Sequence, residues 1–237
     1  FDRMAADYDA QWTATPVGRA QRDQVWRVLD AMFPSGSRVL DVGCGTGEDA
    51  LHLMARGVDV LAVDASQAMV AIAQSQGVAT EVRRAEDLVE LAGTFDGAIS
   101  NFGALNCVAD LPSVARELGR VVRPGGRVAI CLIGRCCLWE SLYFGLRMQF
   151  RKAFRRRRAS SYRGMTVYYP TVAEVRAAFA EGFELGEWRG VGLLVPPSYV
   201  KLPSGVVRAL AACDRVLAGL PLLRAMADHR LFVLVRK

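Results

Sequence analysis

Three glycines at alternate positions follow a short apolar run in the first quarter of the chain. The string VLDVGCGTG begins at residue 39 and contains Gly43, Gly45 and Gly47. This spacing allows a tight turn and a close approach of the backbone to a ligand, which the N–H groups of a following helix can also bind. A dinucleotide fingerprint requires glycine where this chain has Glu48. The carboxylates of Glu48 and Asp41 would repel a pyrophosphate, but they suit a ligand with an amino group and a sulfonium cation.

Further acidic residues follow the next two predicted strands. Asp64 ends the second one, where a carboxylate can accept hydrogen bonds from both ribose hydroxyls of an adenosine-containing ligand. Met69 can lie on the adenine face, with core packing as the alternative. Glu86 and Asp87 can accept from the adenine amine, with a solvated turn as the alternative.

Few side chains are candidates for a catalytic base, because the chain has two histidines. His52 lies inside a predicted helix and is expected to be a packing or surface residue. His229 precedes the last predicted strand, and an antiparallel strand would place it at the carboxyl edge of the sheet, where ligands bind; a structural role is the alternative. Asp228 precedes it, but adjacent strand residues point to opposite faces, so the two need not form a dyad. Other candidate proton acceptors are Glu140, Tyr143 and Tyr169, which are proposed only because of the segment in which they lie.

These residues require elements that bring them to one edge. Apolar runs rich in β-formers alternate with helical stretches from residue 37 onward, which predicts a doubly wound α/β sheet with right-handed crossovers. The predicted strands are residues 38–42, 58–63, 80–84, 95–100 and 127–133. The predicted helices between them are residues 46–56, 66–76 and 111–122. The Arg-Pro-Gly-Gly string at 123–126 is expected to end a helix and turn into the fifth strand.

The alternation stops after the fifth strand. Residues 134–169 mix eight aromatic residues with arginines, a composition that favours a helical insertion at the carboxyl edge of the sheet. Beyond it we expect a helix at 171–180, a strand at 183–194, a helix at 203–226 and a strand at 231–235. Two helices, 1–12 and 17–32, are expected ahead of the sheet.

Composition limits the function classes. With 237 residues and 52% hydrophobic composition, the chain suits one large domain, and its apolar runs are far shorter than the roughly 20 residues of a membrane span. The six cysteines contain no C-x-x-C pair, so neither a metal nor a disulfide framework is expected, and the cytoplasm is the predicted location. No signal-peptide pattern opens the given residues, although the start at Phe1 suggests missing upstream residues.

Charge is concentrated in the insertion. The net charge is +6, and the basic residues Arg147, Arg151, Lys152 and 155–158 fall within twelve positions. Such a cluster can meet phosphates, an anionic membrane surface or an acidic substrate, and a solvated face is the alternative.

The motifs together resemble the class I S-adenosylmethionine-dependent methyltransferases, nearest to the small-molecule group that includes the ubiquinone and menaquinone enzymes (methyltransferase type 11/25-like). The ordered strings are DVGCGTG from residue 41, VDAS from 63, AEDL from 85, FDGAISNFGALN from 95 and RVVRPGGRV from 120. Residues 1–9 also resemble that group's opening helix. The resemblance implies a Rossmann-like seven-stranded sheet whose last strand is antiparallel and lies between the fifth and sixth. A Pro-Pro-Ser-Tyr string at 196–199 is similar to an element of nucleic-acid amino methyltransferases, but it follows the wrong strand, so base N-methylation is disfavoured.

The resemblance also implies site residues. Asp41 with the backbone of Gly43 and Gly45 would hold the methionine part of the cofactor, and Asp64 the ribose. Glu86 or Asp87 with the Ala85 backbone would hold adenine, the Asn101 carbonyl would accept from the amino group, and Tyr8 would close over the carboxylate. The full predicted cofactor set is Tyr8, Asp41, Gly43, Cys44, Gly45, Asp64, Ala65, Met69, Ala85, Glu86, Asp87, Asn101 and Phe102.

The expected activity is methyl transfer by in-line displacement from S-adenosylmethionine to a small aromatic or lipophilic metabolite, with S-adenosylhomocysteine as product. His229 and Tyr143 are the candidate catalytic residues, and a base is needed only if the acceptor must lose a proton. The alternatives are an RNA methyltransferase that uses the arginine-rich insertion and a catalytically silent cofactor-binding protein. A nicotinamide oxidoreductase is disfavoured, since Glu48 stands in the fingerprint and no Tyr-x-x-x-Lys set is found.

One methyltransferase domain is expected over residues 1–237. Its parts are a helical cap (1–33), a cofactor-binding core (37–134), a lid insertion (135–170) and the C-terminal part of the sheet (171–237). The expected partner is a small-molecule acceptor, with nucleic acid disfavoured and peripheral membrane contact through the basic insertion allowed. The protein is expected to be a monomer or a homodimer.

Overall fold

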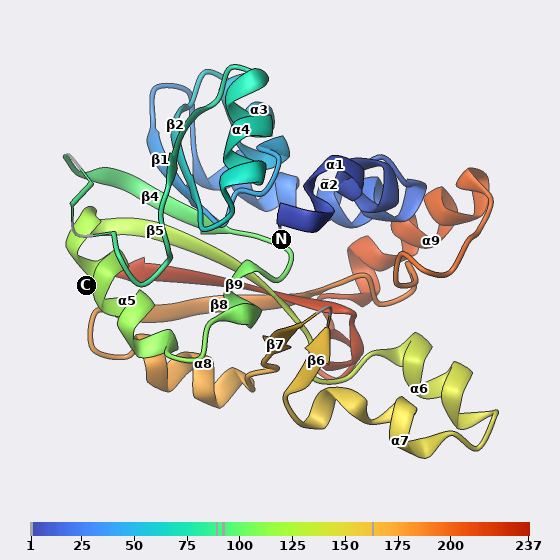
Figure 1. Ribbon diagram of the computed structural model, residues 1–237. Coiled ribbons are helices and arrows are strands. Elements are labelled where there is room, and N and C mark those ends of the chain that lie inside the picture. The colour runs from blue at the N-terminus through green and yellow to red at the C-terminus, as the bar shows by residue number, and fades with distance from the viewer. Residues whose placement is uncertain (1, 89, 92, 163) are drawn as a thin grey trace.

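A seven-stranded sheet forms the centre of the protein in the computed structural model, which describes residues 2–88, 90–91, 93–162 and 164–237. The strand order is β3-β2-β1-β4-β5-β9-β8 (Figure 1). The strands are β1 (Arg38–Val42), β2 (Asp59–Asp64), β3 (Ala79–Val82), β4 (Phe95–Ser100), β5 (Val122–Ile133), β8 (Phe183–Val191) and β9 (His229–Arg236). β9 is antiparallel to both neighbours, β5 and β8. The predicted Rossmann-like sheet, with its last strand between the fifth and sixth, is confirmed.

Helices cover both faces of the sheet (Figure 1). α5 (Leu111–Val121) and α8 (Val172–Phe179) pack on one face, where they share a core with Leu40 and Val42. α2 (Pro16–Met32), α3 (Glu48–Met54) and α4 (Gln67–Ser75) pack on the other face, which receives Val39. Successive strand residues thus enter opposite cores, as the two-residue period of a strand requires.

Side-chain caps fix where several helices begin. Thr15 accepts from the Gly18 N–H at the start of α2, and Ser66 accepts from the Met69 N–H at the start of α4. At α8, Thr171 and Glu174 form a capping box. Such caps supply partners for N–H groups that the first helical turn leaves free.

Two predicted boundaries differ from the structure by five residues or more. β5 begins at Val122 rather than at residue 127, because residues 123–126 remain in the strand and form an irregularity in its pairing with β4. The helix predicted at 203–226 ends much earlier. α9 (Ser204–Leu217) stops before Gly219 and Pro221, and a short 3-10 turn, η5 (Leu223–Met226), follows.

The insertion after β5 is only partly helical, so that prediction is also corrected. It contains α6 (Leu138–Gly145), α7 (Phe150–Ala153) and η4 (Arg155–Arg157), followed by an antiparallel pair of strands, β6 (Ser160–Tyr162) and β7 (Met165–Val167). The Tyr168 N–H donates to the Asn106 carbonyl at 2.7 Å, which ties the end of the hairpin to the core.

The segment ahead of α2 consists of consecutive helical turns: η1 (Asp2–Met4), α1 (Ala5–Tyr8) and η2 (Asp9–Thr13). Phe1, part of the helix predicted at 1–12, lies outside the described residues. Among the residues that the structure describes, no helix combines the length and apolar character needed to cross a bilayer.

Candidate active site

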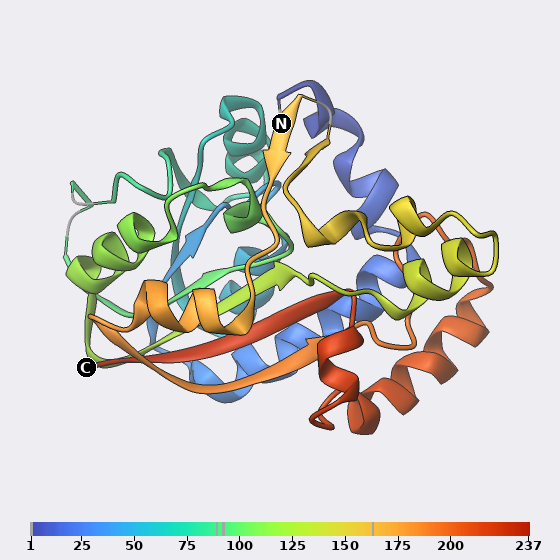
Figure 2. The ribbon, with the colours of Figure 1, turned by 90° about the horizontal axis from the view of Figure 1, so that it is seen from below.

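A cavity of about 1050 Å³ lies at the carboxyl edge of the parallel strands. Its walls include residues that follow β1, β2 and β4, the last residue of β5 and the first of β9. The N-terminal helices and the insertion contribute further walls at the ends of these strands (Figure 2). Drug-sized ligands occupy pockets of roughly 300–1,000 Å³, so this volume is large enough for a cofactor and an acceptor together.

Ten of the residues predicted to bind the cofactor line this cavity: Tyr8, Gly43, Gly45, Asp64, Ala65, Met69, Ala85, Glu86, Asn101 and Phe102. Three predicted residues are not part of the lining. Asp87 is exposed, Asp41 is buried, and the half-buried Cys44 directs its thiol to the Gly45 carbonyl. Of the two acidic residues predicted beside adenine, Glu86 lines the cavity and Asp87 does not.

The glycine loop after β1 has the backbone conformation that its sequence predicts. Gly43 has φ +75°, and a Cβ there would lie 2.3 Å from the Cβ of Ala104. Gly45 has φ +56° and donates its N–H to Oδ2 of Asp64 at 2.9 Å. Both positions thus depend on glycine, the first for space and conformation and the second for conformation.

Asp64 is held by backbone amides. Its Oδ2 accepts from the Gly45 N–H and its Oδ1 from the Ser66 N–H at 2.8 Å. Burial raises the pKa of Asp64, although these two hydrogen bonds act in the opposite direction. Each carboxylate oxygen keeps a free acceptor direction, as a grip on two ribose hydroxyls requires.

A buried acidic pair lies beneath the loop. Asp49 is fully engaged: its Oδ1 pairs with the Arg22 guanidinium at 2.7 Å and accepts from the Trp26 indole at 2.7 Å, and its Oδ2 accepts from the Asn101 amide at 3.1 Å. Asp41 is buried, and its Oδ2 has no hydrogen-bond partner among the described residues. Burial, reinforced by the charge of Asp49, raises the pKa of Asp41 well above its usual range.

These features fit S-adenosylmethionine. An unpartnered buried carboxylate oxygen favours a nearby positive charge, and the cofactor carries two, on its ammonium and sulfonium groups. The glycine loop leaves room for a ligand to approach the backbone. Sequence reasoning did not identify Arg22 or Asp49, which contribute to the cluster through contacts between separate elements.

The N-terminal helical turns are fastened over the loop. Oδ1 of Asp2 accepts from the Ser66 hydroxyl at 2.6 Å, and Oδ1 of Asp9 accepts from the Thr46 hydroxyl at 2.7 Å. These contacts bring Tyr8 and Trp12 into the cavity wall. Burial raises the pKa of Tyr8 to about 12, so the phenol is neutral. The sequence predicted Tyr8 but not Trp12.

His229 lines the part of the cavity next to β9, with its ring edge-on to Phe102 at 5.4 Å between centroids. Its Nδ1 lies 3.4 Å from Oδ2 of Asp228, contrary to the expectation that the two residues point apart. The reason is that β9 begins at His229, so Asp228 lies before the strand and is free of its alternation. Burial lowers the pKa of His229, which favours the neutral imidazole.

Arg156 lies at the centre of a buried ionic network beside His229. Its guanidinium pairs with Oδ1 of Asp228 at 2.7 Å and with both carboxylate oxygens of Glu140. Arg155 and the Tyr199 hydroxyl also donate to Glu140. Burial by itself would raise the pKa of Glu140, but the hydrogen bonds from Arg156 and Arg155 hold it below its usual range. Glu140, a candidate proton acceptor by sequence, is therefore a fixed anion.

The remaining candidates lie in different places. Tyr143 is 47% exposed beneath the Arg147 guanidinium and does not line the cavity, whereas its neighbour Phe144 does. Tyr169 lines the cavity and shares a hydrogen bond with Ser160. His52 stacks on Trp26 and bonds to Asp30, which confirms a packing role.

Residues 197–199 form part of the cavity wall, although their string was discounted as a nucleic-acid motif. Its position after β8 was the reason to discount it, and the same position brings it to the carboxyl edge. No sequence signal beyond that topology would have identified it.

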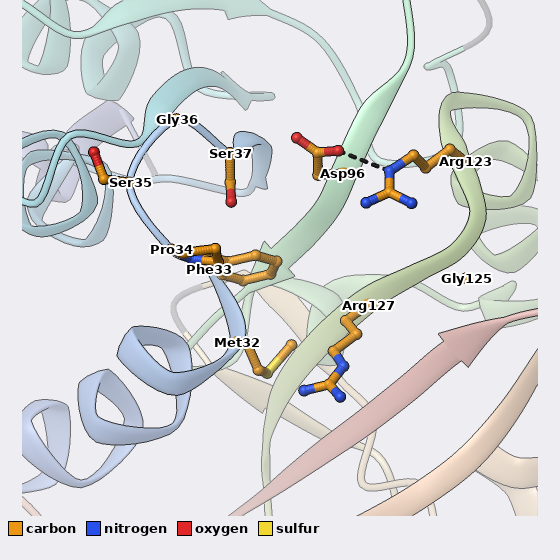
Figure 3. A pocket seen from close by; sticks show the side chains of 10 residues that line it. All are labelled: Met32, Phe33, Pro34, Ser35, Gly36, Ser37, Asp96, Arg123, Gly125 and Arg127. Atoms are coloured by element: carbon orange, nitrogen blue, oxygen red, sulfur yellow. Dashed lines mark hydrogen bonds and ion pairs between the residues drawn. The ribbon is translucent and has the colours of Figure 1, made fainter.

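A smaller pocket of about 330 Å³ lies at the opposite edge of the sheet, around the start of β1 (Figure 3). Both oxygens of its carboxylate, Asp96, already have partners: Arg123 at 2.7 Å and the Arg38 N–H at 2.8 Å. The pocket brings together no set of groups suited to a reaction.

Comparison with known proteins agrees with this site. Residues 39–126, which hold the glycine loop and Asp64, match the model of a methyltransferase domain. Residues 39–126 carry a methyltransferase domain. The cofactor of such domains is S-adenosylmethionine.

Relatives of this methyltransferase domain include a demethylmenaquinone methyltransferase of Clavibacter sepedonicus, 36% identical over 140 residues. The match covers 55% of each chain, so the chain spans about half the length of this relative. A demethylmenaquinone methyltransferase of Paenarthrobacter aurescens is 29% identical over 222 residues, which cover 87% of this chain and 81% of the relative.

Among solved structures, a possible histamine N-methyltransferase of Thermotoga maritima has a similar fold. Its TM-score is 0.67 at 18% identity, and the superposition covers 100% of this chain and 98% of that one. At this identity the likeness concerns the fold alone.

Proposed function

We propose that the protein transfers the methyl group of S-adenosylmethionine to a small aromatic or lipophilic acceptor held in the same cavity. The observation that carries this proposal is the division of the cavity. At the ends of β1, β2 and β3 the lining contains the glycine loop, Asp64 and Glu86, and from the insertion and β9 it contains Phe144, Tyr169 and His229 together with the ionic residues Arg155, Arg156 and Asp228. Carboxylates suit a cationic cofactor, and the aromatic side chains suit a flat, lipophilic acceptor.

S-adenosylmethionine supplies an electrophilic methyl carbon: the acceptor nucleophile bonds to it while the carbon–sulfur bond breaks in line, which leaves S-adenosylhomocysteine. In this proposal Asp64 holds the ribose, Glu86 and the Ala85 backbone hold adenine, and Asp41 favours the positive charge. Met69 and Phe102 pack against the nucleoside, and Asn101 and Tyr8 face the amino-acid end. Placement of two reactants in line supplies a large part of such a rate enhancement, on the order of 7–11 kcal/mol in favourable intramolecular cases.

His229 is the proposed proton acceptor where the acceptor loses a proton on methylation. Its imidazole is neutral and lies in the cavity wall. Asp228 lies beside Nδ1, and Arg156 and Gln21 hold that carboxylate in place. The insertion, residues 135–170, acts as a lid that excludes water from the reaction.

The names of the relatives favour a quinone-like ring as acceptor, since two of them are demethylmenaquinone methyltransferases. An RNA acceptor is less well supported, because Arg155 and Arg156 of the arginine run turn inward to Glu140. We propose the cytoplasm as the location, in keeping with six free cysteine thiols.

Titration calorimetry with S-adenosylmethionine and S-adenosylhomocysteine tests the proposal. The wild type should bind both at micromolar concentration, and Asp64→Ala should lose roughly 1.5–3 kcal/mol, the usual contribution of hydrogen bonds to a charged group. Asp59→Ala is the matched control, since Asp59 begins the same strand at the far edge and its side chain is 74% exposed. A folded wild type that binds neither compound would contradict the proposal.

A further inference from the structure

The outer surface of the helical part of the insertion is strongly apolar. Besides Tyr143, five large apolar side chains of residues 142–154 are exposed there, by 43% to 84%: Leu142, Leu146, Met148, Phe150 and Phe154. We call this surface the apolar tip. It lies on α6, α7 and the turn between them, at the periphery of the molecule in both views (Figures 1 and 2).

The turn that presents the apolar tip has a defined backbone. Met148 has φ +56°, a conformation uncommon for residues other than glycine. Its N–H donates to the Gly145 carbonyl at 2.9 Å, and the Gln149 N–H donates to the Phe144 carbonyl at 2.9 Å. These bonds hold Leu146 and Met148, 84% and 77% exposed, at the outermost turn.

Positive charge surrounds the apolar tip. Residues 141–158 contain seven basic and no acidic residues, which exceeds the whole net charge of +6. Glu140 binds two of these, Arg155 and Arg156. The others are exposed: Arg147, Arg151, Lys152, Arg157 and Arg158.

Several of these cations lie against aromatic rings of the same segment. The Arg147 guanidinium is 3.8 Å from the Tyr143 ring centroid, and that of Arg157 is 4.3 Å from the Phe154 centroid. Rings and aliphatic side chains with basic groups around them are typical of surfaces that enter the headgroup layer of a bilayer.

We propose that the apolar tip docks on an anionic lipid bilayer. The exposed cations complement lipid phosphates, and Leu146 and Met148 can enter the acyl boundary, a contact that a nucleic-acid backbone does not offer. The inner side of the same segment lines the cavity through Phe144 and Arg155. Docking would therefore bring the cavity next to the lipid phase, where a lipophilic acceptor is dissolved.

Flotation with vesicles tests this proposal. Vesicles of phosphatidylcholine with about 30% phosphatidylglycerol should bind the wild type, and vesicles of phosphatidylcholine alone should bind it far less, since the anionic surface potential attracts basic groups. Arg147→Gln/Arg151→Gln/Lys152→Gln should weaken binding roughly a hundredfold, because each basic residue near the surface contributes about a fivefold factor. Leu146→Ser/Met148→Ser should also lose most of the binding.

The control is Arg27→Gln/Arg116→Gln/Arg176→Gln, which removes the same charge from exposed positions on α2, α5 and α8. It should bind anionic vesicles nearly as the wild type does. Equal losses in both triple variants, or no binding by the wild type, would overturn the proposal. Two results together would show a general phosphate-binding surface instead. Leu146→Ser/Met148→Ser would bind anionic vesicles as the wild type does. The wild type would also bind single-stranded RNA, and Arg147→Gln/Arg151→Gln/Lys152→Gln would lose both kinds of binding.

Thermal unfolding shows whether each variant is folded, and calorimetry with S-adenosylmethionine tests the cavity separately. None of the substituted residues lines the cavity. Failure of membrane docking therefore leaves cofactor affinity unchanged, and failure of the proposed methyl transfer leaves vesicle binding unchanged.

Discussion

His229 lies buried in the cavity wall, where desolvation, together with the charge of Arg156, lowers its pKa despite the carboxylate of Asp228 at 3.4 Å. As pH falls, the imidazole becomes protonated only below its ordinary pKa of 6.5 and can then no longer accept a proton. The rate of methylation of an acidic acceptor should therefore fall on the acid side of pH 6.5.

His229→Gln should lower kcat roughly 10²- to 10⁴-fold, the usual contribution of a general base, and remove this acid limb. Measurement of kcat against pH checks it, with His52→Gln as the control because His52 packs on Trp26 away from the cavity lining. An acid limb that persists unchanged in His229→Gln would assign the titration to another group.

The raised pKa of Asp41 predicts that cofactor binding releases a proton. Burial raises its pKa well above the ordinary 3.8, which favours the protonated carboxyl in the free protein, and a bound cation favours the carboxylate. Binding of S-adenosylmethionine at a pH above 3.8 should therefore release a proton. Calorimetry in two buffers of different ionisation enthalpy measures this release, which Asp41→Asn should abolish. A binding enthalpy that is equal in both buffers would contradict the assignment.

The cofactor-site residues that the sequence predicted belong to short contiguous motifs. Gly43 and Gly45 follow the end of β1 and Asp64 ends the adjacent β2, so their motif and topology together place them in one wall. The Arg22–Asp49 pair could not be predicted in this way. It joins two helices whose mutual packing no local string specifies.

At the scale of elements, the loop between β1 and α3 depends on close contact with the 3-10 turn η3 (Ala104–Cys107). Gly43→Ala would put its Cβ 2.3 Å from that of Ala104, so we expect about 1–3 kcal/mol of overpacking in addition to the strain of positive φ. Gly36→Ala is the matched control, because Gly36 has φ +87° and a Cβ there meets nothing within 4 Å. Urea unfolding and cofactor titration of both variants measure the difference. Equal losses of stability in the two variants would mean that positive φ alone, and not the contact with Ala104, requires glycine at position 43.

Long periodic elements were predictable, and short or interrupted ones were not. β1 and β4 agree with their predicted bounds, because most residues of each are apolar or small and turn residues flank them on both sides. β6 and β7 have three residues each, too few for a two-residue period to show. The end of α9 was visible in the sequence as Gly219 and Pro221, but the apolar pattern on either side concealed it.

At the scale of the molecule, Arg156 connects parts of the chain that are far apart in sequence. It joins Glu140 of α6 to Asp228 before β9, and Asp228 in turn accepts from Gln21 of α2. Arg156→Met would remove the guanidinium paired with the buried Asp228 and leave Glu140 with Arg155 as its remaining cation, which costs about 3–5 kcal/mol.

We expect Arg156→Met to lower the Tm by roughly 6 °C or more, given about 2–4 °C per kcal/mol for a chain of this size. Arg158→Met, two residues away and exposed, should leave the Tm nearly unchanged in the same scanning calorimetry experiment. A similar Tm for both variants would show that the network contributes little to stability.

The position of β9 has a consequence for synthesis on the ribosome. β9 pairs with β5 along one edge and with β8 along the other, yet it is translated after all the other strands of the sheet. Until His229–Arg236 emerges, β5 and β8 each lack this neighbour and expose unpaired backbone groups, which other chains can bind. A nascent chain of this protein is therefore prone to aggregate until β9 pairs between β5 and β8.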